Sequence, residues 1–341
     1  MSERRKKVSR RPKSAALTRR QFMKLAGVSA ASGAMSWPGV TLFAAQPGRK
    51  RIVIHGERQV TSLGYHNRRE TEHVSMVDAG LVGQNPVTLE RVPVLAEELP
   101  SIKKGTWKID MQKKTMITVY KLRPGLKWHD GKPYTSKDFE FGWQIAKHPE
   151  FPMPDRLVPE MISKIETPDD RTIVIHWSDL YNEANAVQYT HVRAFPRHLL
   201  LDAFSAGDMK AFANLPFWNK NFIGAGAFRL AEWDAGTRME LEAFNDFALG
   251  KPKIDRITYK TVEDTNTNLA AVMAGEVDFC MRSTISFDGA TILREQWEKA
   301  GKGKVHISPA SWTWLSLSRD NPWFGDVKVR RALLHAIDRD A

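Results

Sequence analysis

The fold is decided by residues 119–133, which read VYKLRPGLKWHDGKP. The stretch that leads into them is rich in β-branched and aromatic residues, which predicts a strand over residues 115–122. A Pro-Gly pair and then an Asp-Gly pair mark two turns after this strand. Trp128, between the turns, is expected to be a packing anchor. Thr135 then opens a helix, with Asp138 at the position of a capping box.

Both strands and helices are predicted on either side of this stretch. Glu240 and Glu242 alternate with Met239 and Leu241, the period of a half-buried strand. The predicted strands are 51–55, 115–122, 171–177, 227–233, 237–244 and 253–260, and the predicted helices are 75–82, one opening at 135, 265–274 and 326–338.

The net charge and the cysteine content argue against several classes of protein function. The 341 residues carry a formal net charge of +12, but residues 1–44 hold ten Lys/Arg and one Glu, which leaves +3 for the other 297. The basic character therefore belongs to the N-terminal tail, and a nucleic-acid-binding function loses its main support. The one cysteine, Cys280, excludes an intramolecular disulfide, a thiolate zinc site and a cysteine-ligated iron–sulfur cluster.

The first 45 residues have the three-part layout of an export signal. Residues 18–24, TRRQFMK, resemble the twin-arginine motif through Arg19 and Arg20, and a long basic region precedes them. The mildly apolar stretch that follows is too rich in Gly, Ser and Ala to be a good membrane span, which favours a cleaved signal over an anchor. Cleavage is expected near Ala44 or Ala45.

Five blocks in a fixed order carry a family resemblance. The first, 119–133, continues into 135–139, and the second, 222–228, has Ala227 where the family more often has proline. The others lie at 244–255, 269–278 and 327–340. Together these blocks resemble the bacterial extracellular solute-binding proteins of family 5, the dipeptide-, oligopeptide- and nickel-binding receptors of ATP-binding-cassette (ABC) transporters.

The resemblance implies an α/β, two-lobed periplasmic-binding-protein-like fold of type II, similar to cluster C, with the second lobe largely missing from this chain. The implied division is a signal peptide at 1–45, a discontinuous first lobe at 46–75 and 200–308, a subdomain inserted into it at 76–199, and the crossover with the start of the second lobe at 309–341.

The resemblance also implies a function. The chain would be the periplasmic receptor of an ABC uptake transporter, would bind a peptide or similar small solute between its lobes, and would need no cofactor. Its other partners would be the membrane permease and the twin-arginine translocase, and it would act as a monomer. The alternative is an exported enzyme whose cofactor is folded in before twin-arginine export.

Candidate ligand-binding residues come partly from the resemblance, which implies that ligand pairs with backbone around residues 63–65 and at the second lobe. Trp312 and Trp314 share one face of a predicted strand, so they are either core residues or a cleft wall. The candidate ligand-binding residues are Leu63, Gly64, Tyr65, His66, Trp312 and Trp314.

The block Lys127, Trp128, His129, Asp130 and Gly131 is expected to be a structural signature. Neighbouring side chains on an extended segment point to opposite faces, so His129 and Asp130 do not form a catalytic pair. The sequence has no Gly-x-Ser-x-Gly elbow and no paired metal-binding histidines of the His-Glu-x-x-His kind, so no catalytic residue and no metal site are predicted.

Replacing both Arg19 and Arg20 by lysine should block export, because the twin-arginine route reads the paired guanidinium groups. The measurement is the amount of the protein in the periplasmic fraction beside that of the parent. A double variant that is exported at the parent's level would show that the twin-arginine assignment is wrong.

Overall fold

The computed structural model describes residues 50–64, 71–85, 88–306, 316–318 and 320–337. The export signal, with Arg19 and Arg20, lies outside these residues, as do Tyr65, His66, Trp312 and Trp314. Within the described part of the chain, no helix is both long enough and apolar enough to cross a membrane.

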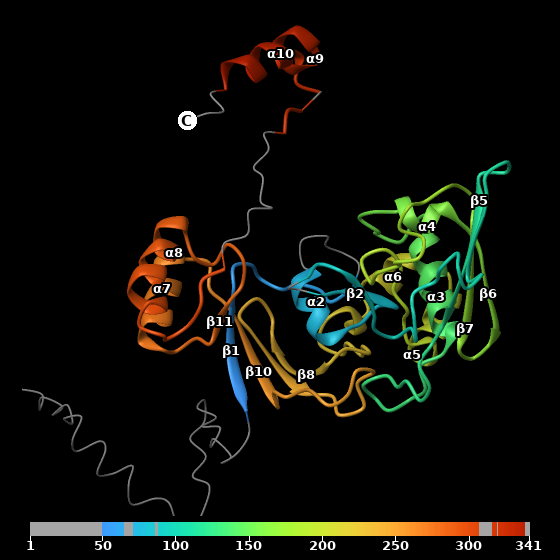
Figure 1. Cartoon of the computed structure of the whole chain (residues 1–341), viewed down its shortest axis with the longest axis horizontal. Coiled ribbons are helices and arrows are strands. Elements are labelled where there is room, and N and C mark those ends of the chain that lie inside the picture. The colour runs from blue at the N-terminus through green and yellow to red at the C-terminus, as the bar shows by residue number, and fades with distance from the viewer. Residues whose placement is uncertain (1–49, 65–70, 86–87, 307–315, 319, 338–341) are drawn as a thin grey trace, which may run out of the picture. The chain divides into compact units, whose positions relative to one another are not determined.

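A five-stranded mixed sheet contains the N-terminal strand of the described chain (Figure 1). The strand order is β11-β1-β10-β9-β8, with β1 parallel to β10 and β11, and β9 antiparallel to both β10 and β8. Met239 and Leu241 of β9 enter the core, as predicted. The predicted alternation is wrong at Glu240, which is also buried and accepts from Thr258 Oγ1 at 2.7 Å. The strands are β1 (Arg51–Gly56), β8 (Phe228–Asp234), β9 (Arg238–Ala243), β10 (Arg256–Thr261) and β11 (Phe279–Cys280).

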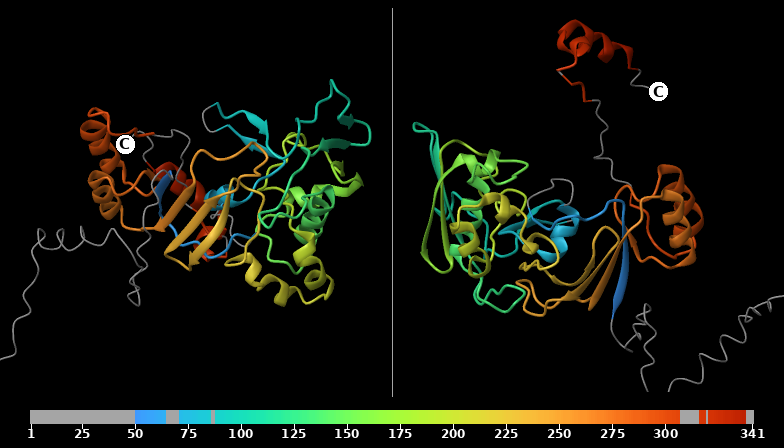
Figure 2. Two further views of the ribbon diagram at one scale, coloured as in Figure 1. Left: turned by 90° about the horizontal axis from the view of Figure 1, so that it is seen from below. Right: turned by 180° about the vertical axis from the view of Figure 1, so that it is seen from behind.

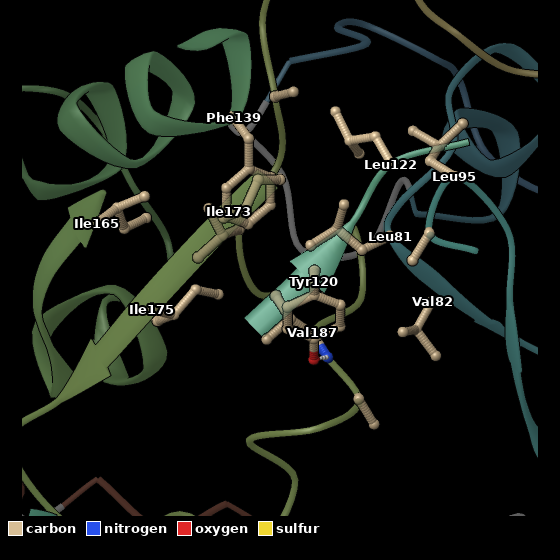
Figure 3. Packing of buried hydrophobic residues seen from close by; sticks show 14 of the residues in the cluster. Leu81, Val82, Leu95, Tyr120, Leu122, Phe139, Ile165, Ile173, Ile175 and Val187 are labelled. Carbon is tan, nitrogen blue, oxygen red and sulfur yellow. Dashed lines mark hydrogen bonds between the residues drawn. The ribbon is translucent and has the colours of Figure 1, made fainter. Parts of the chain in front are cut away.

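A second, antiparallel sheet of four strands has the order β4-β5-β7-β6. Helices α3 and α4 lie against this sheet (Figures 1 and 2). Tyr120 of β5 is buried among aliphatic side chains of this sheet and Phe139 of α3 (Figure 3), and its hydroxyl donates to Ala184 O at 2.9 Å. The strands are β4 (Trp107–Asp110), β5 (Thr115–Lys121), β6 (Ile162–Asp169) and β7 (Thr172–Trp177), and a small sheet pairs β2 (Val82–Gln84) with β3 (Arg91–Pro93).

The helices begin and end at residues that the local sequence explains. Thr135 N donates to Asp138 Oδ2 at 2.8 Å at the start of α3, and Asp264 Oδ1 accepts from Thr267 N at 2.7 Å at the start of α7. The helices are α2 (Thr71–Val77), α3 (Ser136–Lys147), α4 (Leu157–Met161), α5 (Arg197–Ser205), α6 (Met209–Ala213), α7 (Thr265–Ala274), α8 (Phe287–Leu293), α9 (Pro322–Gly325) and α10 (Val327–Ala336), with single turns at Pro216–Trp218 and Arg294–Glu298.

The predicted helix over residues 75–82 is wrong in its bounds. Helix α2 ends at Val77, and Val82 already belongs to strand β2. Residues 74–82 are mostly apolar and fit a helix by composition. Asp78 N still donates to Val74 O of the helix at 2.8 Å, but the Asp78 carboxylate is held by partners far along the chain. The predicted strand at 253–260 is also shifted, because β10 begins three residues later, at Arg256.

Two hydrophobic cores lie within the described chain, and α3 joins them. Phe139 belongs to the core of the four-stranded sheet, whereas Phe141 and Ile145 belong to the core of the five-stranded sheet. Helix α3 therefore contributes to the cores of both sheets, and the division at 76 and 199 stays a prediction. A third, smaller cluster lies between α7 and α8.

His73 of α2 should make the protein sensitive to acid. Its ring is 4% exposed, and neither ring nitrogen has a hydrogen-bond partner among the described residues. Burial lowers the pKa of His73 from 6.5 to about 4. Between these two values the unfolded chain binds a proton that the folded chain excludes, so stability is full above pH 6.5 and falls as the pH drops towards 4.

At pH 5 this penalty is about 2 kcal/mol. The substitution His73→Phe keeps an aromatic ring against Tyr259, whose ring centroid lies 5.0 Å away, and removes the proton site. The free energy of unfolding, measured at pH 7 and pH 5, should fall less in this variant than in the parent. The exposed His335 serves as control: if His335→Phe has the same effect as His73→Phe, burial is not the cause.

Candidate functional site

Leu63 and Gly64, the two described residues of the predicted ligand-binding segment, are buried and tied into the protein by their backbone. Leu63 N donates to Trp218 O at 2.7 Å, and Gly64 N donates to Ser62 Oγ at 3.0 Å. Their carbonyl oxygens accept from Arg193 Nη1 at 2.9 Å and 3.2 Å. All four backbone polar groups of these two residues are therefore engaged inside the protein.

Arg193 is held by a buried ion pair with Asp78. Its Nε and Nη2 lie 2.9 Å and 2.7 Å from Asp78 Oδ2, and both side chains are 3% exposed. The guanidinium carbon also lies 5.1 Å from the centre of the Phe195 ring and 5.5 Å from that of Phe222. Burying two charges is favourable only when their remaining hydrogen-bonding groups are satisfied, and Arg193 Nη1 contributes to this by donating to the carbonyls of residues 63 and 64.

The second oxygen of Asp78 binds two backbone amides. Asp78 Oδ1 accepts from Ala79 N at 3.0 Å and from Ala225 N at 3.2 Å. The segment around Ala225 approaches the end of α2 so closely that a Cβ atom on Gly226 would lie 2.4 Å from Asp78 N. Glycine at 226 is therefore required by the contact itself, and the segment Gly224-Ala225-Gly226 is a packing surface for the end of α2.

His129 of the signature block clamps the same glycine segment. Gly224 N donates to His129 Nδ1 at 3.3 Å, so Nε2 carries the proton and donates to Gly226 O at 3.1 Å. The backbone N of His129 donates to Gly224 O at 2.9 Å. Burial lowers the pKa of His129 below its ordinary value, although the hydrogen bond to Gly226 O opposes this shift. The neutral ring that this arrangement needs is thus favoured by its surroundings.

The rest of the signature block forms a tight turn on the four-stranded sheet. Gly131 N donates to Trp128 O at 2.9 Å, and the buried Trp128 ring lies 4.7 Å from that of Tyr134. Asp130 Oδ2 lies 2.6 Å from Nε2 of His198, while His129 faces residues 224–226. The structure therefore gives His129 and Asp130 different partners. Lys127 Nζ lies on the surface, 2.9 Å from Asp246 Oδ2.

The structure brings together five stretches that the sequence separates widely: residues 63–64, 78, 129, 193 and 224–226. Asp78 and Arg193 were not predicted as functional residues. Each stands alone as a charged residue between apolar neighbours, in Val77-Asp78-Ala79 and Val192-Arg193-Ala194, and this pattern is the available sequence signal. Among the described residues, no cluster of three or more His, Cys, Asp or Glu side chains could hold a metal ion.

Comparison with known proteins identifies the family. The model for the middle region of bacterial extracellular solute-binding proteins, family 5, matches residues 90–341, and the chain belongs to this family.

Among curated relatives, the chain is 28% identical over 215 residues to a putative ABC transporter peptide-binding protein of Brucella ovis, covering 63% of this chain and 39% of the relative. It is 30% identical over 226 residues to the oligopeptide-binding protein AppA of Bacillus subtilis, covering 65% and 39%.

Solved structures establish the fold. NikZ from Campylobacter jejuni, in complex with Ni(L-His), matches with a TM-score of 0.66 at 21% identity, over 84% of this chain and 53% of that one. AppA from Bacillus subtilis, in complex with a nonapeptide, matches with a TM-score of 0.64 at 23% identity, over 86% and 55%. The α/β fold of these binding proteins is therefore confirmed for this chain, which spans about half of the solved structures and about two fifths of the curated relatives.

Replacing Arg193 by methionine should be strongly destabilising, by about 3–5 kcal/mol, because it leaves the Asp78 carboxylate buried without its partner. Adding Asp78→Asn should recover part of this loss, since asparagine keeps the oxygen that accepts from Ala79 N and Ala225 N while removing the charge. The measurement is the free energy of unfolding in urea for the parent, both single variants and the double variant.

The exposed Lys127–Asp246 pair provides the matched control. Lys127→Met should change the free energy of unfolding by about 1 kcal/mol or less, because a solvent-exposed ion pair contributes little. If Arg193→Met costs no more than Lys127→Met, or if Asp78→Asn makes the Arg193→Met protein less stable still, the buried pair does not have the role described here.

Proposed function

We propose that this chain is the extracytoplasmic substrate-binding component of an ABC uptake transporter and that it binds a peptide or similar small solute without chemical conversion. Its membership in the family of extracellular solute-binding proteins is the observation that carries the proposal. The relatives named for oligopeptides and peptides support a peptide-like ligand. Binding of this kind needs placed polar groups and apolar walls but no acid, base or nucleophile.

The geometry supports two roles within the predicted binding segment: structural support by some residues and ligand contact by others. The backbone of Leu63 and Gly64 is engaged by Arg193, Trp218 and Ser62, so these two residues form a fixed base. We assign the direct ligand contacts to Tyr65 and His66, which follow this base in the sequence, and to Trp312 and Trp314. Aromatic side chains of this kind offer a peptide both apolar surface and hydrogen-bonding groups.

The proposed location and partners follow from the same function. Export by the twin-arginine route would deliver a folded protein to the periplasm, with the signal removed near Ala44 or Ala45. The loaded receptor would then deliver its solute to a membrane permease. We propose that it does so as a monomer.

The test uses the product of the complete open reading frame, purified from the periplasm. Native mass spectrometry should find a small non-covalent ligand, and calorimetric titration of the emptied protein with the ligand should give a dissociation constant in the micromolar range or below. Tyr65→Ala and His66→Ala should each weaken binding about tenfold or more while leaving the unfolding temperature unchanged, because these residues are proposed to contact ligand and not the core.

Two results would overturn the proposal. A flavin, haem or metal centre retained in stoichiometric amount, together with catalytic turnover, would favour the exported enzyme. Binding that is unaffected by both substitutions would remove Tyr65 and His66 from the site.

A further inference from the structure

The hairpin of β4 and β5, with the residues that lead into it, combines positive charge with exposed apolar side chains. Residues 101–114 contain five lysines and one aspartate, and no arginine. Three apolar side chains in this segment are exposed: Met111 at 70%, Ile102 at 64% and Ile109 at 39%. Met111 lies in the turn between the two strands, and Ile109 lies in β4.

Most of this positive charge is not neutralised within the protein. Lys104 pairs with Glu98, and Lys113 Nζ lies 3.8 Å from Asp110 Oδ2. Lys103, Lys108 and Lys114 are exposed and have no ion-pair partner among the described residues.

The single carboxylate of the segment is partly engaged by the turn itself. Asp110 Oδ1 accepts from Gln112 N at 3.1 Å and from Lys113 N at 3.0 Å. The turn therefore presents lysines and Met111 outward.

The position of the hairpin leaves this surface accessible. Strand β4 is at the edge of its sheet, and the end of the hairpin extends past helices α3 and α4 (Figures 1 and 2). Ile109 and Met111 thus belong to a hairpin at the edge of its sheet.

We propose that residues 102–114 dock onto an anionic lipid surface, with Met111 entering the interfacial region and the lysines contacting the headgroups. Amphipathic surfaces that combine lysine with exposed apolar residues bind membranes through both effects together. The composition favours lipid over an acidic protein, because protein interfaces are enriched in arginine and aromatic residues and depleted in lysine. The lysine ammonium is a point charge that suits the diffuse charge of a headgroup layer.

The experiment places an environment-sensitive fluorophore at position 111. The substitution Cys280→Ser removes the only thiol of the chain, and Met111→Cys then allows labelling at one site. Vesicles of phosphatidylglycerol and phosphatidylcholine in equal parts should shift the emission to the blue, whereas pure phosphatidylcholine vesicles should not. High salt should remove the shift, because it screens charges at an exposed surface. No solute is needed, so the outcome is separate from the ligand-binding test.

Replacing Lys103, Lys108 and Lys114 together by glutamine should weaken vesicle binding on the order of 100-fold, about fivefold for each lysine. The matched control is another exposed apolar and basic segment, Leu249 with Lys251 and Lys253. A label at Leu249→Cys should not shift, and glutamine at Lys251, Lys253 and Lys299 should leave the signal at position 111 unchanged.

Three outcomes would overturn the proposal. The label at position 111 could fail to respond to anionic vesicles. The label at 249 could respond equally, or the control lysine substitutions could reduce binding equally, which would make binding a property of total charge. Soluble polyglutamate could produce the shift while vesicles do not, which would point to an acidic protein partner.

Discussion

The buried ion pair between Asp78 and Arg193 is the interaction on which the candidate site depends. Its two charges are out of contact with water, so each must be satisfied by protein groups. Asp78 accepts from the backbone amides at 79 and 225, and Arg193 donates to the carbonyls at 63 and 64. The pair therefore fixes the end of α2, the glycine segment before β8 and the start of the predicted binding segment in one arrangement.

The signature block also contacts the glycine segment that Asp78 binds. His129 holds residues 224–226 through both ring nitrogens, and burial favours the neutral ring that these bonds need. Helix α3, which follows the signature, adds a second constraint. A Cβ atom on Gly142 would lie 1.7 Å from Arg193 O, so only glycine lets the helix pack against the backbone of the ion-pair segment. The signature block, residues 127–131, thus forms a local turn and also holds residues 224–226, which are distant in the sequence.

Local features could be predicted from the sequence, because local chemistry determines them. The hairpin of β8 and β9 follows from two short strand-like segments around the Asp234-Ala235-Gly236 turn, and the first residues of α3 and α7 follow from the acidic residues that cap them. The end of α2 and the pairing of Asp78 with Arg193 could not be predicted in the same way. The two partners are separated by 115 positions, and the residues around Asp78 do not indicate that Arg193 is its partner. Apolar flanks show that a charged residue will be buried, but not where its counter-charge comes from.

In the proposed function, the backbone of Leu63 and Gly64 supports the predicted binding segment, and the contacts with ligand come from other residues. If the carbonyl oxygens of Leu63 and Gly64 bound ligand directly, a change of ligand would disturb their hydrogen bonds with Arg193. The buried guanidinium charge would then lose hydrogen-bond partners, which is energetically unfavourable. With those groups committed to the protein, side chains at the following positions can change without altering the ion pair, the glycine contact or the His129 clamp. In the proposed function, such an arrangement would let one scaffold accept different solutes, with the energetic cost of change confined to the residues that touch the solute.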